Sequence, residues 1–246
     1  MKRLALALAL MLAVLLCMPC AAQETEAGRK VAYLTFDDGP NSMTPQLLDV
    51  LREYDAPATF FLVGSSVLRC PEETRMILDA GHAVGCHSMY HSMRKLKEST
   101  GYVERDIARF MEAMRTVEPS FTTDLYRFPG GSTSYEPATR RFVRDLGFAW
   151  FDWNASNGDA ETKYSSDREM VNYTVKSIEH TSDSVIVLMH EGKKRTIRVL
   201  PDVIKYLRDN GYELRALSSG EEERELLAAC PARLMFPGDE LPGAKE

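Results

Sequence analysis

The chain has 246 residues, of which 44% are apolar and 27% charged, so its composition is that of an ordinary globular protein with one sizeable core. Its formal net charge of −6 argues against a nucleic acid as a partner. Beyond residue 22 the cysteines are Cys70, Cys86 and Cys230, with no CxxC pair. This pattern excludes a disulfide-built mini-domain and gives a zinc ribbon no support.

The first 22 residues, MKRLALALALMLAVLLCMPCAA, have the layout of a secretory signal peptide, with Lys2 and Arg3 ahead of an apolar run. We expect cleavage after Ala22, a linker over residues 23–29, and a protein that is secreted or associated with the cell envelope. Cleavage would remove two cations and no acid, which moves the formal charge from −6 to −8. An uncleaved membrane anchor is the alternative, although the apolar run is shorter than the ~20 residues that span a bilayer.

Apolar segments of strand length alternate with longer segments of helical periodicity between residues 30 and 217. In chain order, the sequence predicts strand 31–36, helix 44–54, strand 58–63, helix 72–80, strand 82–86, helix 102–117, strand 125–128, helix 136–146, strand 148–153, helix 168–179, strand 184–189, helix 197–209 and strand 212–217. Strands separated by helices predict a single α/β domain with a parallel sheet, which a chain of this size can close into a barrel-like fold.

Glycines mark the ends of several predicted helices. Gly81, Gly147 and Gly211 each stand between a helical segment and the next strand, where helix-ending glycines are common. Residues 218–246 differ in character, because a short acidic segment there precedes several prolines and glycines. We expect a peripheral C-terminal helix and a loose tail over these residues.

Reactive side chains follow several predicted strands at the carboxyl end, where the active sites of such folds gather. The stretch TFDDGP alone could form no more than a turn, because Asp-Gly is a common turn pair. A lone histidine near a sheet is also more often a structural hydrogen bonder, and we interpret His82 and His180 in that way. Together, however, the strand ends carry Asp37, Asp38, His87, His91, Arg127 and His190.

The spacing of His87 and His91 suits a shared metal ion, because residues four apart lie on one face of a helical turn. Catalytic zinc commonly takes three histidine or carboxylate ligands, so one aspartate of TFDDGP would complete the set. The two aspartates are adjacent and point in different directions, so one can bind the metal while the other faces its water. Cys86, beside His87, is interpreted as a small buried apolar residue.

Such an arrangement predicts hydrolysis. A metal can lower the pKa of water from ~15.7 towards ~7, and a nearby carboxylate can take the proton as the water attacks a carbonyl. The anionic intermediate needs stabilising by the metal and a backbone N–H, and the leaving group needs a proton. His190, at the end of an apolar strand, is the available proton donor.

With these residues in place, the sequence resembles the polysaccharide deacetylases of the NodB-homology type, also called carbohydrate esterase family 4. The motifs TFDDGP, HSMYH, RFPGG, DWNASNGD and LMH occur in the family's order and span a catalytic domain over about residues 30–217. The resemblance implies a deformed (β/α) barrel with about seven parallel strands. It also implies one divalent metal ion, most often Zn²⁺ and sometimes Co²⁺ or another ion.

The resemblance also implies a role for each matching residue. Arg127 is expected to pair with Asp37 and to hold it ionised and oriented, since a guanidinium suits a carboxylate geometrically. Leu188 is expected to line a small pocket for the acetyl methyl group, and Ser88 to support the loop between the two histidines. Carried over from the family, the base is Asp37, the general acid is His190, and the metal ligands are Asp38, His87 and His91.

The chain departs from the family pattern at two motifs. Gly130 stands where many relatives have Tyr. Glycine keeps the backbone N–H for the oxyanion but lacks the aromatic ring that would form one wall of the substrate groove. The fourth motif often supplies an aspartate that tunes the catalytic histidine. Asp159 is our choice for that role, with Asp152 as the alternative, and Trp153 is interpreted as core or groove wall.

Two enzymatic functions and one binding function fit these residues. The leading hypothesis is a metal-dependent N-deacetylase that acts on an N-acetylated glycan, with peptidoglycan or a chitin-like polymer as the expected substrate. An O-acetyl esterase acting on xylan would use the same metal, base and acid. The third is a catalytically silent glycan-binding protein. Such a protein would be expected to lack the base or the acid, but Asp37 and His190 are both present. The sequence leaves the oligomeric state open.

Overall fold

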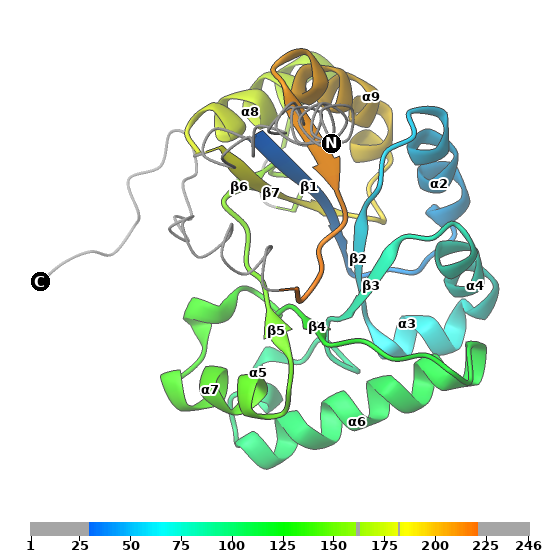
Figure 1. The fold of residues 1–246 in the computed structure, drawn as a ribbon, viewed down its shortest axis with the longest axis vertical. Helices are drawn as coiled ribbons and strands as arrows, with labels where there is room; N and C mark the ends of the chain where they lie inside the picture. The colour runs from blue at the N-terminus through cyan, green and yellow to red at the C-terminus, as the bar shows by residue number, and fades with distance from the viewer. Residues whose placement is uncertain (1–29, 161–162, 182, 221–246) are drawn as a thin grey trace, which may run out of the picture.

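The structure is a computed structural model that describes residues 30–160, 163–181 and 183–220 (Figure 1). The predicted signal peptide, the linker at 23–29 and the chain beyond residue 220 lie outside the described residues, so these assignments stay predictions. None of the helices that the structure describes is long and apolar enough to cross a membrane.

One sheet forms the centre of the described fold, and every strand pair in it is parallel. Its order is β5-β4-β3-β2-β1-β7-β6, with β8 paired to β1 outside this path. In chain order, the strands are β1 Lys30–Asp37, β2 Thr59–Leu62, β3 Ala83–Cys86, β4 Leu125–Tyr126, β5 Ala149–Trp150, β6 Ala155–Ser156, β7 Ser184–His190 and β8 Tyr212–Arg215.

The sheet curls into an incomplete barrel, and β1 is one of the strands of its wall (Figure 1). One edge of β1 pairs with β7 over residues 31–37, whereas the other edge pairs first with β8 and then with β2. Within the described residues no pairing joins β5 to β6, so the barrel is open there. The predicted α/β domain with a deformed (β/α) barrel of about seven parallel strands is confirmed. The added strand, β6, has two residues and is too short to show a strand pattern.

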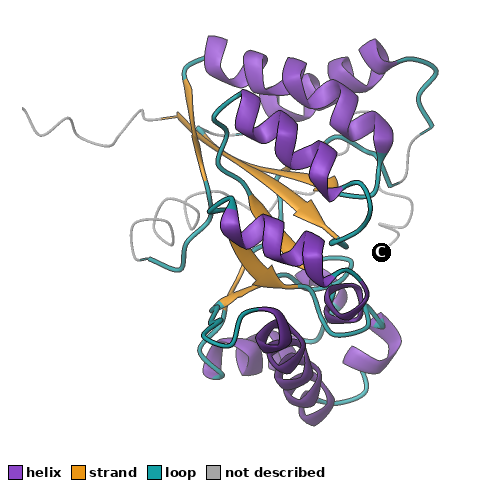
Figure 2. Ribbon diagram, turned by 90° about the vertical axis from the view of Figure 1, so that its right-hand side faces the viewer, coloured by secondary structure: helices purple, strands orange, loops and turns teal. Residues whose placement is uncertain are grey.

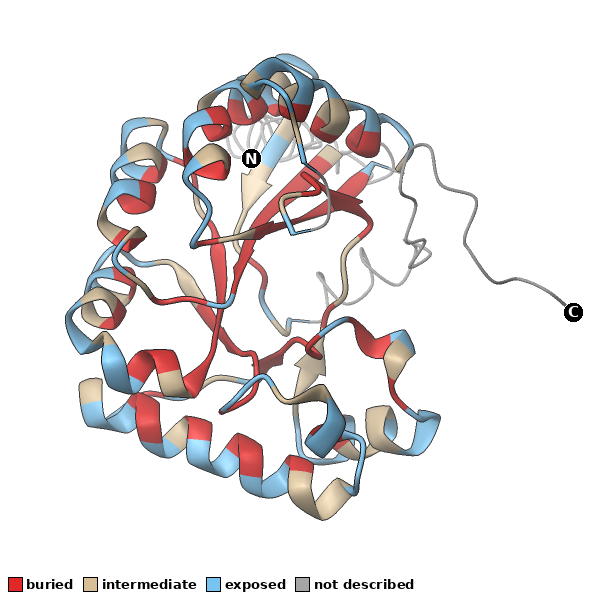
Figure 3. Ribbon diagram, turned by 180° about the vertical axis from the view of Figure 1, so that it is seen from behind, coloured by how far each residue is buried: buried red, intermediate tan, exposed pale blue. Residues whose placement is uncertain are grey.

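Helices pack around the outside of the sheet (Figure 2), and their buried faces turn toward it (Figure 3). The six predicted helices are all present, and the short α3, α5 and η1 were not expected because they span too few residues for a periodic pattern. In the described residues the helices are α2 Thr44–Glu53, α3 Gly64–Arg69, α4 Pro71–Asp79, α5 Met93–Leu96, α6 Thr100–Val117, η1 Ser132–Ser134, α7 Pro137–Asp145, α8 Asp167–Glu179 and α9 Lys194–Asp209.

Gly81, Gly147 and Gly211 end α4, α7 and α9 as expected. Each has a positive φ, between 76° and 93°, which is the left-handed conformation that glycine adopts without a Cβ clash. These turns return the chain to the amino ends of β3, β5 and β8, so the carboxyl ends of the strands meet at the opposite edge of the sheet.

The alternation of side chains along β1 divides the core into two parts. Ala32, Leu34 and Phe36 belong to the larger cluster, which lies between the sheet and the helices. Val31 and Tyr33 belong to a smaller cluster that also contains residues of β2, β4 and β7 and fills the barrel interior. β1 is therefore buried on both faces, as is usual for a central strand of a parallel sheet.

The packing of α6 against the larger cluster gives a first stability prediction. Phe110 on α6 is 0% exposed, so Phe110→Ala should lower the free energy of unfolding by about 3–5 kcal/mol. Leu68→Ala on α3 is the control, because Leu68 is 52% exposed and should change this free energy by no more than ~0.5 kcal/mol. Urea unfolding of both variants measures the difference, and equal losses would contradict the described packing of α6.

Candidate active site

The alternation of β1 and β7 directs two of the predicted site residues into the barrel. Val31 and Tyr33 lie in the interior cluster, so Asp37 lies on the same face of β1. Ile186 lies in that cluster too, and His190 follows it at an even spacing on β7. Asp37 and His190 occupy paired positions of the two strands. Two residues distant in sequence therefore meet at the carboxyl edge of the sheet.

Arg127, directly after β4, joins this edge from inside the barrel. Its side chain is 0% exposed, and the guanidinium carbon lies 4.2 Å from the centre of the Phe61 ring. Nη1 donates to Oδ1 of Asp37 at 2.9 Å and to Oγ1 of Thr35 at 2.7 Å, while Nε donates to the carbonyl oxygen of Phe151 at 3.0 Å. The expected contact between Arg127 and Asp37 is thus present, and it fixes one oxygen of the carboxylate.

Asp38, His87 and His91 form a group that could hold a metal ion. Their candidate ligand atoms all lie within 4.8 Å of one another. Oδ1 of Asp38 lies 3.7 Å from Nε2 of His87 and 3.5 Å from Nε2 of His91. One carboxylate oxygen and two imidazole nitrogens are a donor set typical of catalytic zinc. Asp38 has a φ of +72°, which turns its side chain away from that of Asp37.

His87 is held in one orientation by the main chain of Arg127. Its Nδ1 lies 2.9 Å from the carbonyl oxygen of Arg127, which can only accept, so Nδ1 carries the proton of the neutral ring and Nε2 keeps its lone pair. Nε2 lies 3.6 Å from Oδ2 of Asp37. Burial lowers the pKa of His87, although the charge of Asp37 opposes this shift. A neutral imidazole with a free Nε2 is the form that binds metals.

The loop after His87 is held by two side chains. Ser88 Oγ accepts the backbone N–H groups of Tyr90 at 3.2 Å and His91 at 3.0 Å, which is the support expected of this serine. Oδ2 of Asp106 accepts the N–H of Met89 at 2.8 Å. Ser88 and His91 both have positive φ, at 74° and 52°, a conformation that costs a non-glycine residue energy. These hydrogen bonds therefore stabilise a strained loop.

Sequence reasoning did not identify Asp106. It is 3% exposed on α6, and burial raises its pKa, while hydrogen bonds from the loop oppose that shift. A signal was present, because Asp106 lies within the apolar face that Val103, Ile107 and Phe110 form. A lone carboxylate among apolar neighbours of a helix needs a buried partner, which here is the loop that carries the two histidines.

His190 is oriented by Asp159. Its Nδ1 lies 2.6 Å from Oδ1 of Asp159, and its backbone N–H donates to Oδ2 at 2.8 Å. The hydroxyl of Thr196 donates to the same Oδ2 at 2.6 Å. Burial lowers the pKa of His190, but the hydrogen bond and the charge of Asp159 outweigh it, so the pKa is raised overall. Nε2 of His190 faces Oδ2 of Asp38 at 4.0 Å.

Asp152, the alternative partner for His190, makes a different contact. Its two carboxylate oxygens accept from the backbone N–H and the hydroxyl of Ser132, at 2.9 Å and 2.5 Å. It thereby anchors the loop that contains Gly130, which is exposed and has a φ of +72°. A Cβ at Gly130 would lie 2.5 Å from Cε of Met93, so the methionine occupies the space beside this glycine.

The remaining predicted residues lie around the same edge. Leu188 is buried on β7, opposite Thr35 of β1. Trp153 is partly buried against the interior cluster, and its ring centre lies 5.8 Å from the guanidinium carbon of Arg127. Cys86 is fully buried at the end of β3, as its interpretation as an apolar residue requires. Cys230 lies outside the described residues.

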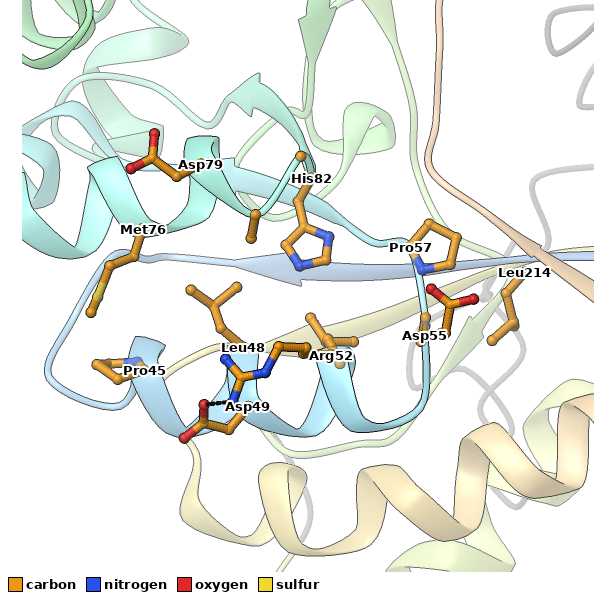
Figure 4. A pocket seen from close by; sticks show the side chains of 14 residues that line it. Pro45, Leu48, Asp49, Arg52, Asp55, Pro57, Met76, Asp79, His82 and Leu214 are labelled. Carbon is orange, nitrogen blue, oxygen red and sulfur yellow. Dashed lines mark hydrogen bonds and ion pairs between the residues drawn. The ribbon is translucent and has the colours of Figure 1, made fainter.

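A separate hollow of about 860 Å³ lies at the other end of the sheet, between α2 and α4. Figure 4 shows His82 facing this hollow across from Leu48 and Arg52. His82 precedes β3 and contacts Phe60, with ring centres 5.3 Å apart, and burial lowers its pKa. The ring contact with Phe60 agrees with a structural role for His82, while its interpretation as a hydrogen bonder stays a prediction.

Comparisons with known proteins agree with the arrangement of these site residues. A family model described as polysaccharide deacetylase matches residues 24–151. The chain is 32% identical over 192 residues to a peptidoglycan-N-acetylglucosamine deacetylase of Bacillus cereus, with 76% of this chain and 69% of that protein covered. It is 30% identical over 209 residues to a chitooligosaccharide deacetylase of Sinorhizobium fredii, with 77% and 91% covered.

A solved structure agrees with the sequence comparisons. A carbohydrate esterase family 4 (CE4) esterase of Streptococcus mutans superposes with a TM-score of 0.73 at 32% identity, covering 78% of this chain and 87% of that one. The family model covers more than half of the 246 residues, and the Asp-Asp, His-His and His motifs lie together in space. The chain therefore belongs to the polysaccharide deacetylase family.

Proposed function

We propose that this protein is a metal-dependent hydrolase that removes N-acetyl groups from a polysaccharide, with peptidoglycan or a chitin-like glycan as the substrate. One observation carries the proposal: the Asp38–His87–His91 group lies between Asp37, held by Arg127, and His190, held by Asp159. The named activities of the relatives in Bacillus cereus and Sinorhizobium fredii support both the reaction and the substrate class.

Asp38, His87 and His91 would hold the metal. Their donor atoms suit Zn²⁺, with Co²⁺ or another divalent ion as the alternative. When bound, such an ion supplies Lewis-acid activation of water and polarises the carbonyl of the acetamide. The hydrogen bond from His87 Nδ1 to the Arg127 carbonyl oxygen supports this assignment, because metal-binding histidines usually have their other nitrogen fixed in this way.

Asp37 would act as the general base. Its Oδ1 accepts from Arg127, so Oδ2 is the oxygen that points toward the metal-binding side, 3.6 Å from Nε2 of His87. A carboxylate fixed at one oxygen can receive a proton at the other without reorienting. The guanidinium of Arg127 also balances the charge of a carboxylate that is only 2% exposed.

His190 would act as the general acid. Asp159 accepts the proton of Nδ1, so a second proton on Nε2 can pass to the nitrogen of the leaving amine. Burial raises the pKa of Asp159, but hydrogen bonds from His190 and Thr196 and the charge of His190 lower it overall. An ionised Asp159 would stabilise the imidazolium that donates the proton.

Three residues would contact the substrate. The N–H of Gly130 would face the oxyanion, Leu188 would line the acetyl pocket, and Trp153 would form part of the groove wall.

We also propose that residues 1–22 direct export, which would bring the enzyme to a cell-wall or extracellular glycan. N-terminal sequencing of the exported protein tests this, since a mature chain that begins at Gln23 is expected.

The first test is acetate release by the purified protein with added zinc. N-acetylglucosamine oligomers and peptidoglycan should release acetate, and Asp37→Asn should lower the rate at least ~100-fold, the lower range for a general base. Turnover of acetylated xylan alone would instead identify an O-acetyl esterase. Glycan binding without acetate release from any of the three would identify a silent glycan-binding protein.

Removal of a proposed metal ligand should weaken metal binding and lower the deacetylase activity. Asp38→Ala and His91→Ala should retain less zinc than the wild type after dialysis. Their acetate release should fall by about 100-fold or more, because loss of even an outer-shell partner can lower metal affinity or activity by about 10- to 100-fold. His180→Ala is the matched control, because His180 is exposed at the end of α8, before β7 begins, whereas His190 stands at the other end of that strand. Full activity in Asp38→Ala would rule out the proposed metal dependence.

The alkaline limb of the pH profile should report His190. A general acid must be protonated, so kcat/KM should fall as the pH rises through the pKa of His190. Asp159→Asn removes the hydrogen bond and charge that raise this pKa, so the alkaline limb should move to lower pH. Asp152→Asn is the control, because Asp152 contacts Ser132, and an equal shift in both variants would contradict the assignment of Asp159.

A further inference from the structure

The residue after His190 is a buried acid that the reaction does not use. Glu191 is 0% exposed, and its backbone N–H donates to the carbonyl oxygen of Asp37 at 3.2 Å. Its carboxyl lies against residues 39–44, which connect the end of β1 to the start of α2. Glu191 thus touches the segment that follows the proposed metal ligand Asp38, while the residue before it, at the end of β7, is the proposed acid His190.

One carboxyl oxygen of Glu191 is held by a short hydrogen-bonded chain. The hydroxyl of Thr44 donates to Oε1, and Oγ1 of Thr44 in turn accepts the backbone N–H of Asn41 at 3.1 Å. These contacts connect β7 to the first residue of α2 and to the turn before it. Burial raises the pKa of Glu191 to about 7, although the hydrogen bond from Thr44 opposes the shift.

The other oxygen, Oε2, lies against Gly39. Among the described residues no donor makes a hydrogen bond to Oε2. A Cβ added to Gly39 would lie 1.5 Å from Oε2, closer than any two non-bonded atoms can approach. The φ of Gly39 is outside the left-handed region, so the carboxyl of Glu191, and not the backbone conformation, is what a Cβ at this position would displace.

Two unfavourable features therefore share this short segment. A buried carboxyl oxygen without a donor is unfavourable, and so is a left-handed conformation at a non-glycine residue such as Asp38. Strain of this kind persists where the surroundings fix the conformation, and it concentrates at functional sites. Glu191 is the group that packs beneath the strained turn and fixes it to β7.

We propose that Glu191 is a positioning residue, which holds the turn at residues 38–41 so that Asp38 stays within reach of His87 and His91. Its hydrogen bond to Thr44 fixes the far end of the turn, and its contact with Gly39 fixes the near end. The side chain touches none of the three ligands in the contacts described, so it acts through the main chain. The inference rests on the proposed metal site.

The affinity of the metal-free full chain for zinc tests this inference. Competition with a chromogenic chelator should give a dissociation constant for Glu191→Ala about 10- to 100-fold above that of the wild type, the range for supporting residues of metal sites. Thr44→Val should weaken binding in the same direction but less. Thr174→Val is the matched control, because Thr174 is also 0% exposed and donates only within α8, to the Met170 carbonyl oxygen.

Excess zinc adds a readout that loss of fold alone would not give. If Glu191 acts by holding Asp38, saturating zinc should restore much of the kcat of Glu191→Ala, with KM for the glycan close to that of the wild type. Wild-type zinc affinity in both Glu191→Ala and Thr44→Val would overturn the inference. Should Glu191→Ala fail to fold, Thr44→Val decides alone, and a wild-type protein that binds no zinc would instead refute the proposed function.

A double-mutant cycle tests the contact itself without metal. Gly39→Ala should destabilise the metal-free wild type in urea, because the new Cβ meets Oε2 of Glu191. In the Glu191→Ala background that space is open, so the same substitution should shift the urea midpoint much less. Equal shifts in the two backgrounds would overturn the placement of Glu191 against Gly39.

Discussion

The site depends on one buried cation. The guanidinium of Arg127 reaches the interior face of β1 through Thr35 and Asp37, and it also donates to the main-chain carbonyls of Phe151 and Asp152 beyond β5. It thereby ties β1 to the segment after β5 inside the open barrel. A buried ion pair is not in itself stabilising, but removing one partner of such a pair costs about 3–5 kcal/mol. The arrangement of these strands and the position of the Asp37 carboxylate therefore depend on each other.

The doublet in TFDDGP works because the chain changes conformation between its two acids. Asp37 is the last residue of β1 and follows the strand alternation into the barrel, where Arg127 holds it. Asp38 has a positive φ, so it leaves that alternation and lies beside His87 and His91. Two identical side chains thus receive different surroundings within one peptide unit. A strand continuing through both positions would have sent the second carboxylate to the helix-packed face of the sheet.

Much of the fold and of the candidate site could be predicted from the sequence, because the hydrophobic pattern and the reactive residues indicate the same arrangement. The long helices and the strands β1 and β7 have clear hydrophobic patterns. The motifs fall at the carboxyl ends of strands, where the active sites of such folds gather. The two-residue strand β6 and the short α3 and α5 could not be predicted, since they form only where tertiary contacts select them. The choice between Asp159 and Asp152 also needed coordinates, because both stand in the same motif. Asp106 and Glu191 act through loops that the sequence does not place.

His87 and His190 show how the same residue type can be suited to two chemical roles. In both, Nδ1 is fixed by an oxygen, but the partner of His87 is a neutral carbonyl and that of His190 is a carboxylate. A carbonyl cannot balance the cost of burying a charged ring, so the pKa of His87 is lowered and the ring stays neutral. The carboxylate of Asp159 more than balances it, so the pKa of His190 is raised and the ring can hold a second proton. Neighbouring groups whose pKa values are driven apart in this way are suited to ligand and acid, respectively. The acceptor at Nδ1 contributes to this difference, together with the deeper burial of His87 and the charge of His91 beside it.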